Sequence, residues 1–295
     1  MFLLHAMVFS VVSPPANLLI LGPGSPQVQL IAGKLAANIG YATTIVTGPQ
    51  NELRANRLMY GDSWDAVSPD RRPVLASSSS QIGSALGRAE ALVLVAESGG
   101  AAGLEKALPF APRIRRIALL SCIGGSTGGS GNLGEDFDPA TEAKCLELAD
   151  RAGVDLAIVR VGFLKGGGAA GGGEREPLGL DAAAYYASLR PGGYESPASR
   201  CAQAYDRLML GASLSFGDSV KPRNAFARSG TRQSHSPFPD EASRISAAGA
   251  LLACLRAPTP PSVTLSAAEG RVTPTEAEWD QMLAAISSGL ETPSA

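Results

Sequence analysis

One stretch decides the fold, LLILGPGSPQ at Leu18–Gln27. Its apolar run leads directly into Gly-x-Gly, and helically spaced apolar residues follow as far as Ile39. The next segment, TTIVT at Thr43–Thr47, has the β-branched composition of a strand. The order strand, glycine turn, helix, strand predicts the opening unit of a dinucleotide-binding fold.

The glycine turn predicts a site for a diphosphate. Gly22 permits a tight turn, and Gly24 lets a diphosphate approach the backbone above the positive end of the following helix. The predicted contacts in this turn are Gly22, Gly24, Ser25, Pro26 and Gln27. Gln27 stands where the usual fingerprint has its third glycine, so a glycine turn in some other α/β protein remains the alternative.

The composition is that of a globular protein, with 295 residues, 45% of them hydrophobic, and a formal net charge of −2. A charge so close to zero gives no general field for nucleic acid, which is therefore not expected as a partner. The four cysteines form no CxxC pair, and three lie in the apolar or helical contexts of reduced, buried thiols. The two histidines, His5 and His235, are far apart, so no zinc site, other metal site or Ser-His-Asp triad is expected.

Apolar runs alternate with helical patterns along most of the chain. Buried strands are predicted at 91–95, 117–121 and 156–161, and the helix between the last two covers 141–152. Such alternation predicts an α/β fold, a Rossmann-type doubly wound parallel sheet with helices on both faces. An amphipathic helix at 240–255 with Asp240 as its cap, a strand at 263–265 and a helix at 275–287 complete it, beside a small irregular C-terminal lobe.

Four segments follow from this reading. They are an apolar N-terminal arm (1–16), a nucleotide-binding core (17–165), a flexible glycine-rich and irregular insertion (166–239), and C-terminal helices with a last strand that complete the same domain (240–290). The arm contains no Lys or Arg and is too short to span a bilayer. A targeting remnant, an arm that docks on a partner, and an ordinary first strand or tail all remain open for it.

Several segments together resemble the atypical, or extended, short-chain dehydrogenase/reductase superfamily in its NmrA-like branch. They are Leu18–Gln27, the strand IALLS at Ile117–Ser121, the segment Ala143–Leu164, and PDEAS at Pro239–Ser243 with the strand VTL after it. The third segment is the most specific, because its helix, glycine and strand end in Arg-Val-Gly-x-Leu where the family has Arg-Pro-Gly-x-Leu. The likeness covers nearly the whole chain.

The resemblance implies a catalytic Tyr-x-x-x-Lys pair, in which the lysine lowers the pKa of the tyrosine and binds the nicotinamide ribose. Lys144 stands at a plausible position for that lysine, but the residue four positions earlier is Ala140. Lys144 is thus either a ribose contact or a solvated helix lysine. Four tyrosines in the later, irregular region could reach a site in space: Tyr185, Tyr186, Tyr194 and Tyr205.

The resemblance also implies a bound dinucleotide. No acidic residue follows the second strand at Thr47, whereas Arg54 and Arg57 follow closely and could bind a 2′-phosphate. NADP(H) is therefore favoured over NAD(H). A site that binds neither is the third outcome. In addition to the turn residues, the cofactor contacts expected are Thr47, Arg54, Ala96, Ser121, Lys144, Val161 and Gly162.

Three functions are compatible with these residues. The first is a non-catalytic accessory or structural subunit of a larger assembly, which the missing tyrosine favours and which implies protein partners. The second is an NADPH-dependent reductase or isomerase acting on a small carbonyl compound, and the third is a redox sensor that binds NADP(H) without turnover. Family members of the first type imply an organellar setting, with the chloroplast favoured over the mitochondrion and the cytoplasm as the alternative. They also imply that any membrane association is peripheral and occurs through a complex, not through a transmembrane segment.

Overall fold

A computed structural model describes residues 17–48, 51–97, 101–123, 140–168, 178–189, 211–218, 241–268 and 272–289. Several expectations lie outside these residues: the apolar arm, the residues Asp240, Tyr194 and Tyr205, and one of the four cysteines, Cys201.

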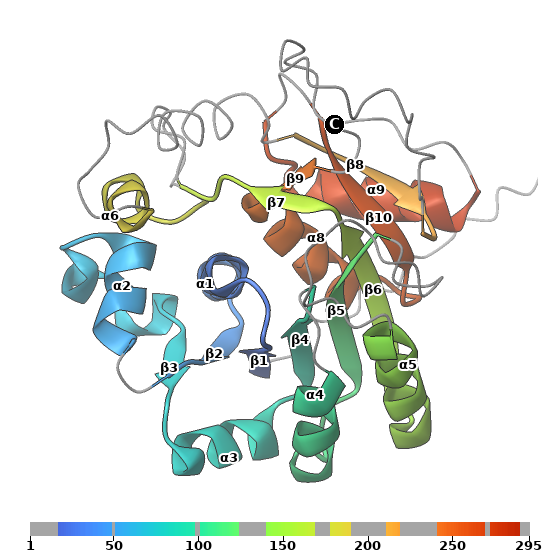
Figure 1. Ribbon diagram of the computed structural model, residues 1–295, viewed down its shortest axis with the longest axis horizontal. Helices are drawn as coiled ribbons and strands as arrows, with labels where there is room; N and C mark the ends of the chain where they lie inside the picture. The colour runs from blue at the N-terminus through green and yellow to red at the C-terminus, as the bar shows by residue number, and fades with distance from the viewer. Residues whose placement is uncertain are drawn as a thin grey trace, which may run out of the picture.

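The centre of the molecule is an eight-stranded sheet with the order β3-β2-β1-β4-β5-β6-β10-β8. All neighbouring strands are parallel except β8, which runs antiparallel to β10 (Figure 1). The strands are β1 Asn17–Leu21, β2 Ala42–Val46, β3 Val74–Ala76, β4 Ala91–Val95, β5 Arg116–Cys122, β6 Asp155–Val161, β8 Gly211–Phe216 and β10 Ser262–Ala268. The order 3-2-1-4-5-6 is that of a doubly wound Rossmann sheet. The predicted fold class is confirmed.

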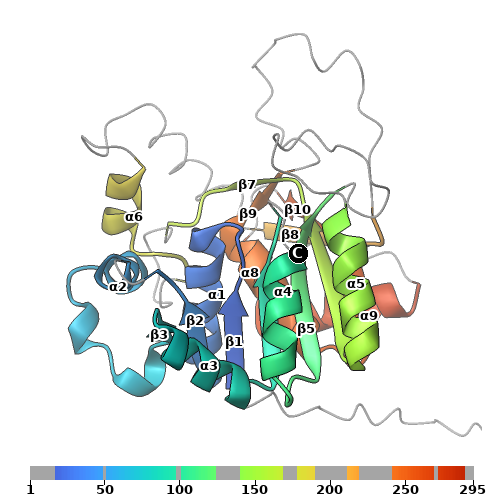
Figure 2. The same cartoon turned by 60° about the horizontal axis from the view of Figure 1, so that its bottom comes forward.

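Helices cover both faces of this sheet (Figures 1 and 2). One face carries α1 Pro26–Asn38, α2 Glu52–Tyr60, α6 Ala182–Ser188, α8 Arg244–Arg256 and α9 Glu276–Ser287; the other carries α3 Ser79–Arg88, α4 Ala101–Ala107 and α5 Ala140–Ala152. Three short 3-10 helices lie at Trp64–Ala66, Pro69–Arg71 and Leu108–Phe110.

Side chains alternate along each strand and therefore contribute to two hydrophobic cores, one on each face of the sheet. In β1, Leu18 and Ile20 join the core under α1 and α8, while Leu19 and Leu21 join the core under α3, α4 and α5. All five residues of β4 are buried, as expected for a strand paired on both edges and covered on both faces.

Helix α8 differs from its prediction. It is buried on nearly all sides, because it packs against the sheet, α1 and α9 together rather than lying on the surface. Its N-cap is Ser243, whose hydroxyl accepts a hydrogen bond from the Ile245 amide. The residues before it form the short strand β9 Glu241–Ser243, which pairs in parallel with β7 Phe163–Lys165. The expected helix start at Asp240 is therefore wrong.

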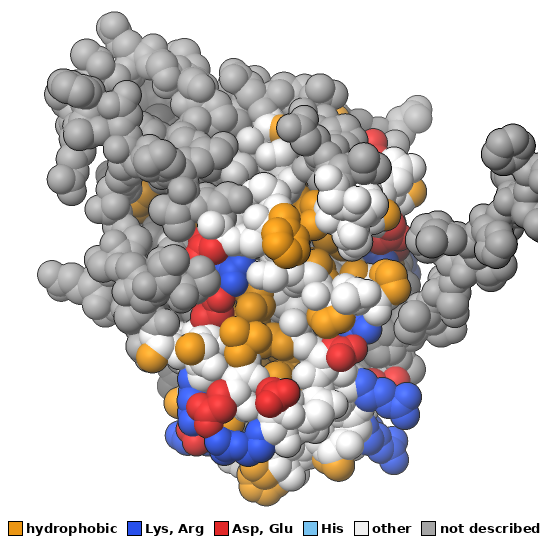
Figure 3. Space-filling view, turned by 90° about the vertical axis from the view of Figure 1, so that its right-hand side faces the viewer, with side chains coloured by type: hydrophobic (Ala, Val, Ile, Leu, Met, Phe, Trp, Pro, Cys, Tyr) orange, Lys and Arg blue, Asp and Glu red, His pale blue; other side chains and the backbone are white. Residues whose placement is uncertain are grey.

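The described residues contain no candidate membrane span, and one face of the molecule carries charges of both signs. None of the helices in the described ranges is both long and apolar enough to cross a bilayer. On the face shown in Figure 3, acidic and basic side chains lie near one another, with apolar groups between them.

Candidate nucleotide site

The turn after β1 is fixed by the end of β4. Gly22 has φ +143, and a Cβ atom there would lie 2.0 Å from the Val95 carbonyl oxygen. The Gly24 amide donates a hydrogen bond of 2.9 Å to the same oxygen, and a Cβ at Gly24 would come within 2.1 Å of the Glu97 carboxylate. Both glycines are therefore required sterically, because the turn passes close over the neighbouring strand.

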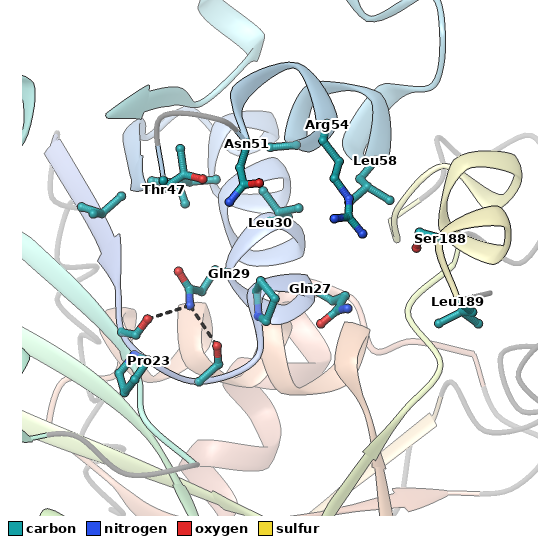
Figure 4. Close-up of a pocket in the computed structure, with 17 residues that line it drawn as sticks. Pro23, Gln27, Gln29, Leu30, Thr47, Asn51, Arg54, Leu58, Ser188 and Leu189 are labelled. Atoms are coloured by element: carbon teal, nitrogen blue, oxygen red, sulfur yellow. Dashed lines mark hydrogen bonds between the residues drawn. The ribbon is translucent and has the colours of Figure 1, made fainter. Parts of the chain in front are cut away.

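A buried amide holds the shape of this turn. The Gln29 side chain, one turn into α1, donates from Nε2 to the carbonyl oxygens of Gly22 at 3.0 Å and Gly24 at 3.2 Å (Figure 4). These two bonds turn the carbonyl groups of the loop towards the helix and fix its backbone.

Helix α1 begins at a conventional cap. The Ser25 hydroxyl accepts from the Val28 amide, and Pro26 occupies the first helical turn, where its missing N–H is not needed. The amide of Ser25 itself donates to Glu97 Oε1 at 2.6 Å. A carboxylate of the chain thus lies at the positive end of α1.

A cavity of about 430 Å³ opens beside this turn. Its walls come from the turn, the N-terminal part of α1, the end of β2, and helices α2 and α6 (Figure 4). Six predicted contacts line it: Gly22, Gly24, Pro26, Gln27, Thr47 and Arg54. Its size falls within the range of small-molecule sites, roughly 300–1,000 Å³.

Arg54 is the cation of this cavity. Its guanidinium extends from α2 into the space between Gln27 and Ser188 (Figure 4), and within the described chain it has no ion-pair partner. Arg57, the other arginine predicted for a 2′-phosphate, instead pairs with Asp62 at 3.5 Å on the exposed surface. The structure therefore separates the two arginines and brings only Arg54 to the site.

The outer wall of the cavity depends on a buried lysine. Lys34, which is 4% exposed in α1, donates to the carbonyl oxygens of Met59 at 3.0 Å and Gly179 at 2.8 Å. These bonds join α1, the end of α2 and the segment that leads into α6. They place Ser188 and Leu189 opposite Arg54, residues that the sequence analysis did not assign to the site.

A second polar cluster lies at the ends of β5 and β6 and is sealed by its own contacts. Arg160 is 4% exposed and Glu142 is 3% exposed, and they form a two-bond ion pair through Nε (3.0 Å) and Nη2. The Ser121 hydroxyl donates to Glu142 Oε2 at 3.0 Å, Arg160 Nη1 donates to Ser262 at 2.8 Å, and Asp218 lies 3.7 Å from Arg160 Nε. Ser121 was predicted to contact a cofactor, but the structure holds its hydroxyl in this buried network.

Lys144 is placed with a partner on its own helix. Its ammonium lies 3.3 Å from the Glu147 carboxylate on the exposed side of α5, as expected of a solvated helix lysine. Of the tyrosines expected to reach a site, Tyr185 and Tyr186 belong to α6, at the far end of the sheet from α5 (Figure 1). The Tyr185 hydroxyl donates to the Gly166 carbonyl at 2.7 Å. Neither phenol lies beside Lys144.

The remaining predicted contacts are strand ends. Ala96 and Val161 are buried, Gly162 is buried after β6, and none of the three lines the cavity. The sequence analysis missed Gln29 and Glu97. The sequence does contain a signal for Glu97, because this carboxylate comes two residues after the wholly apolar strand β4, at the C-terminal edge of the sheet.

The three described cysteines are buried thiols. Cys122, Cys145 and Cys254 are free and buried, and burial raises the pKa of each thiol to about 12, as the expected reduced and buried state implies. Within the described ranges, no three His, Cys, Asp or Glu side chains gather around a common point that could hold a metal ion.

The cavity suits the adenosine part of a dinucleotide, but the turn beside it does not suit the diphosphate. The cavity offers an arginine and an apolar wall to a phosphorylated adenosine. The turn, however, offers few amides to a diphosphate: residues 23 and 26 are prolines, the Gly24 amide donates to Val95, and the Ser25 amide donates to Glu97. The position at which the sequence predicted a diphosphate holds a carboxylate instead.

Comparisons with known proteins agree with the fold. No family model matches the chain, and no curated protein matches it by sequence. Among solved structures, a Bacillus halodurans protein described as an NAD-dependent epimerase/dehydratase is similar, with a TM-score of 0.52, 12% identity, and coverage of 92% of this chain and 99% of that one. A wide-type short-chain dehydrogenase/reductase from Veillonella parvula, solved with NADP, gives a TM-score of 0.49 at 12% identity over 88% of this chain and 99% of that one. The chain therefore has a Rossmann-type fold similar to that of the Bacillus halodurans protein.

Proposed function

We propose that this protein binds a phosphorylated adenosine nucleotide at the α1–α2–α6 cavity and does not transfer hydride, so that it acts as an accessory or regulatory subunit. The observation that carries the proposal is the replacement of the Tyr-x-x-x-Lys chemistry by structural contacts on α5. Ala140 has no proton to give, and the Lys144 ammonium lies on the Glu147 carboxylate.

The sealed cluster beside α5 supports the same conclusion. A carbonyl substrate needs an open space with a free donor at the end of β5, but Ser121 donates to Glu142, and Arg160 neutralises that carboxylate. All three side chains are buried. Opening the cluster to a substrate would leave an ionised carboxylate and a guanidinium without their hydrogen bonds, which is energetically costly.

The expected result of an activity assay follows from these contacts. With NADPH and a panel of small aldehydes and ketones, the loss of absorbance at 340 nm should not exceed the rate without protein, and Lys144→Ala should change nothing. The matched control is Lys106→Ala, which removes an exposed lysine from α4. Turnover that Lys144→Ala abolishes and Lys106→Ala leaves intact would show instead that the protein is a reductase.

Arg54 favours a nucleotide with a phosphate on the adenosine ribose. Its planar guanidinium suits bidentate contact with a phosphate, and the end of β2 offers Thr47 and Gly48 rather than an acid for a ribose diol. The apolar groups that line the cavity near Arg54 are Leu30, Ala55 and Leu58, which supply a surface for a base.

Replacing Arg54 by alanine should weaken binding of adenosine 2′-monophosphate about tenfold, because a charge-assisted hydrogen bond at a partly exposed site is lost. Binding of adenosine, which has no phosphate, should be unchanged. Isothermal titration calorimetry measures both. Arg57→Ala is the control, since Arg57 lies on the same helix and pairs with Asp62. Equal losses of affinity for adenosine 2′-monophosphate in the two variants would show that Arg54 does not bind the phosphate.

An accessory role requires protein partners. We expect the native protein to migrate with a mass well above the 30.2 kDa of the chain when extracts are separated under mild conditions. Migration at the mass of the single chain in its own cell would contradict the accessory role without affecting the nucleotide site.

A further inference from the structure

Glu97 occupies a place where an external anion would be expected. It follows β4 at the point where the order of the sheet reverses between β1 and β4, the position at which ligands bind in open α/β sheets. One carboxylate oxygen accepts from the Ser25 amide at 2.6 Å, at the positive end of α1. The other oxygen is buried without a hydrogen-bond partner in the described structure.

The surroundings of Glu97 keep this carboxylate near the turn. On β5, Cys122 donates from Sγ to the Glu97 carbonyl at 3.4 Å, which ties down the backbone of the residue. On α8, Arg244 is near enough to act on the carboxyl electrostatically, although its own Nη1 donates to the Gly166 carbonyl at 2.8 Å. No ion pair within 4.0 Å joins Glu97 and Arg244 in the described chain, so Ser25 is the hydrogen-bonded partner that fixes the carboxylate.

The amides of residues 23 to 26 are either missing or already engaged within the chain. Pro23 and Pro26 have no N–H, and the Gly24 amide is engaged with the Val95 carbonyl. The Ser25 amide is the remaining loop donor whose partner is known, and that partner is Glu97. A diphosphate that entered here would not find the Ser25 amide free, because that amide already donates to Glu97. The Glu97 carboxylate would also repel the negatively charged diphosphate.

We infer that Glu97 is a built-in anion that excludes the diphosphate of a dinucleotide, so that the cavity takes a mononucleotide, an adenosine with a phosphate on its ribose. This inference rests on the proposed nucleotide binding and names its ligand class. The adenosine part and its phosphate lie against α2 and α6, where Arg54, Thr47 and Ser188 line the cavity. Glu97 itself does not line that cavity, so it opposes the diphosphate and leaves the adenosine part untouched.

The test compares two probes that share their adenosine end. Adenosine 2′-monophosphate carries the ribose phosphate alone, whereas NADP⁺ adds the diphosphate and the nicotinamide riboside. For the wild-type protein we expect NADP⁺ to bind no more tightly than adenosine 2′-monophosphate. Titrations are made at pH 8, which favours the ionised carboxylate, because desolvation raises the pKa of Glu97 above its ordinary 4.5.

Glu97→Gln removes the charge and keeps a side-chain oxygen for the Ser25 amide. This variant should bind NADP⁺ about tenfold more tightly than the wild type and adenosine 2′-monophosphate equally well. Glu97→Ala, which frees the amide altogether, should gain at least as much. The control is Glu105→Gln, which removes the same charge from the exposed surface of α4 and should change neither affinity.

The outcomes separate the two proposals. If NADP⁺ already binds the wild type far more tightly than adenosine 2′-monophosphate, and Glu97→Gln adds nothing, the inference is wrong while nucleotide binding stands. If neither probe binds any of the variants, nucleotide binding itself is wrong and the inference falls with it. Thermal melting of each variant confirms that a loss of binding is not a loss of fold.

A measurement without ligand tests the buried carboxylate directly. The folded protein raises the pKa of Glu97 above its unfolded value of 4.5, chiefly through desolvation, against the hydrogen bond from Ser25 and the charge of Arg244. The stability contributed by this group is therefore full below pH 4.5 and is lost as the pH rises through the folded pKa. The melting temperature of Glu97→Gln should rise relative to wild type over that range, and a constant difference would contradict the burial of this carboxylate beside the turn.

Discussion

Replacing Arg160 by methionine should lower the free energy of unfolding by about 3–5 kcal/mol. The substitution leaves the Glu142 carboxylate buried at 3% exposure with Ser121 as its hydrogen-bond donor, and it removes the cation that faces Asp218. The Glu142 carboxylate would then remain buried without the guanidinium that neutralises it. Equilibrium unfolding in urea, followed by circular dichroism, measures the loss.

Two further variants separate the buried ion pair from general effects of the substitution. The double variant Glu142→Gln/Arg160→Met should lose less than the sum of its single variants, because neither charge is left without the other. Arg151→Met removes an exposed arginine that pairs with Glu147 on the same helix, and should cost less than about 1 kcal/mol. A loss from Arg160→Met no larger than that of Arg151→Met would contradict the buried pair.

Replacing Gly22 by alanine should destabilise the protein by at least about 3 kcal/mol or prevent folding. The new methyl group would lie 2.0 Å from the Val95 carbonyl oxygen, and the backbone at φ +143 disfavours any residue with a side chain. Relief would need β1 and β4, which are paired neighbours in the sheet, to separate at the turn. Soluble yield and urea unfolding report the effect.

Gly83→Ala is the matched control for the same chemical change. Gly83 lies on the exposed side of α3 with nothing within 4 Å of a Cβ atom, so alanine should stabilise the helix by about 0.5–1 kcal/mol. Opposite signs for the two glycines would show that the cost at Gly22 comes from the turn. A Gly22→Ala protein as stable as the wild type would contradict the described approach of the turn to β4.

The central strands were predictable because their signal is local. The run Ala91–Val95 is apolar throughout, and β4 has those bounds. The strand predicted at Ile117–Ser121 is one residue longer at each end in β5, where a charged and a polarisable residue, Arg116 and Cys122, still pair with β6. The alternation of these strands with helices predicted a doubly wound parallel sheet.

The C-terminal part of the fold depends on contacts that a local pattern does not contain. The apolar residues of α8 suggested one buried stripe, but three neighbouring elements bury nearly the whole helix. Strand β9 consists of three residues, and its pairing with β7 is set by a partner 78 positions away, Phe163 opposite Glu241. No periodicity in three residues can indicate such a pairing.

The residues of the site also divide into those with a local sequence signal and those whose role depends on a distant residue. The tight turn at Gly22 and Gly24 could be predicted because an apolar strand, two glycines and a helical pattern follow one another directly in the chain. The role of Glu97 depends on Ser25, 72 positions earlier, and that of Ser121 depends on Glu142 and Arg160. A pattern that indicates where a serine or a carboxylate lies along a strand does not indicate which distant group satisfies it.

The pairing of β10 with β6 has a consequence for synthesis of the protein. Ser262–Thr264 lie opposite Ile158–Arg160, and α8 covers the same face of the sheet as α1. Until the last strand leaves the ribosome, β6 has a bare edge and α1 lacks its neighbour. The nascent chain therefore exposes this part of its apolar interior until α8 and β10 have been synthesised, and we expect chaperones to shield it until then.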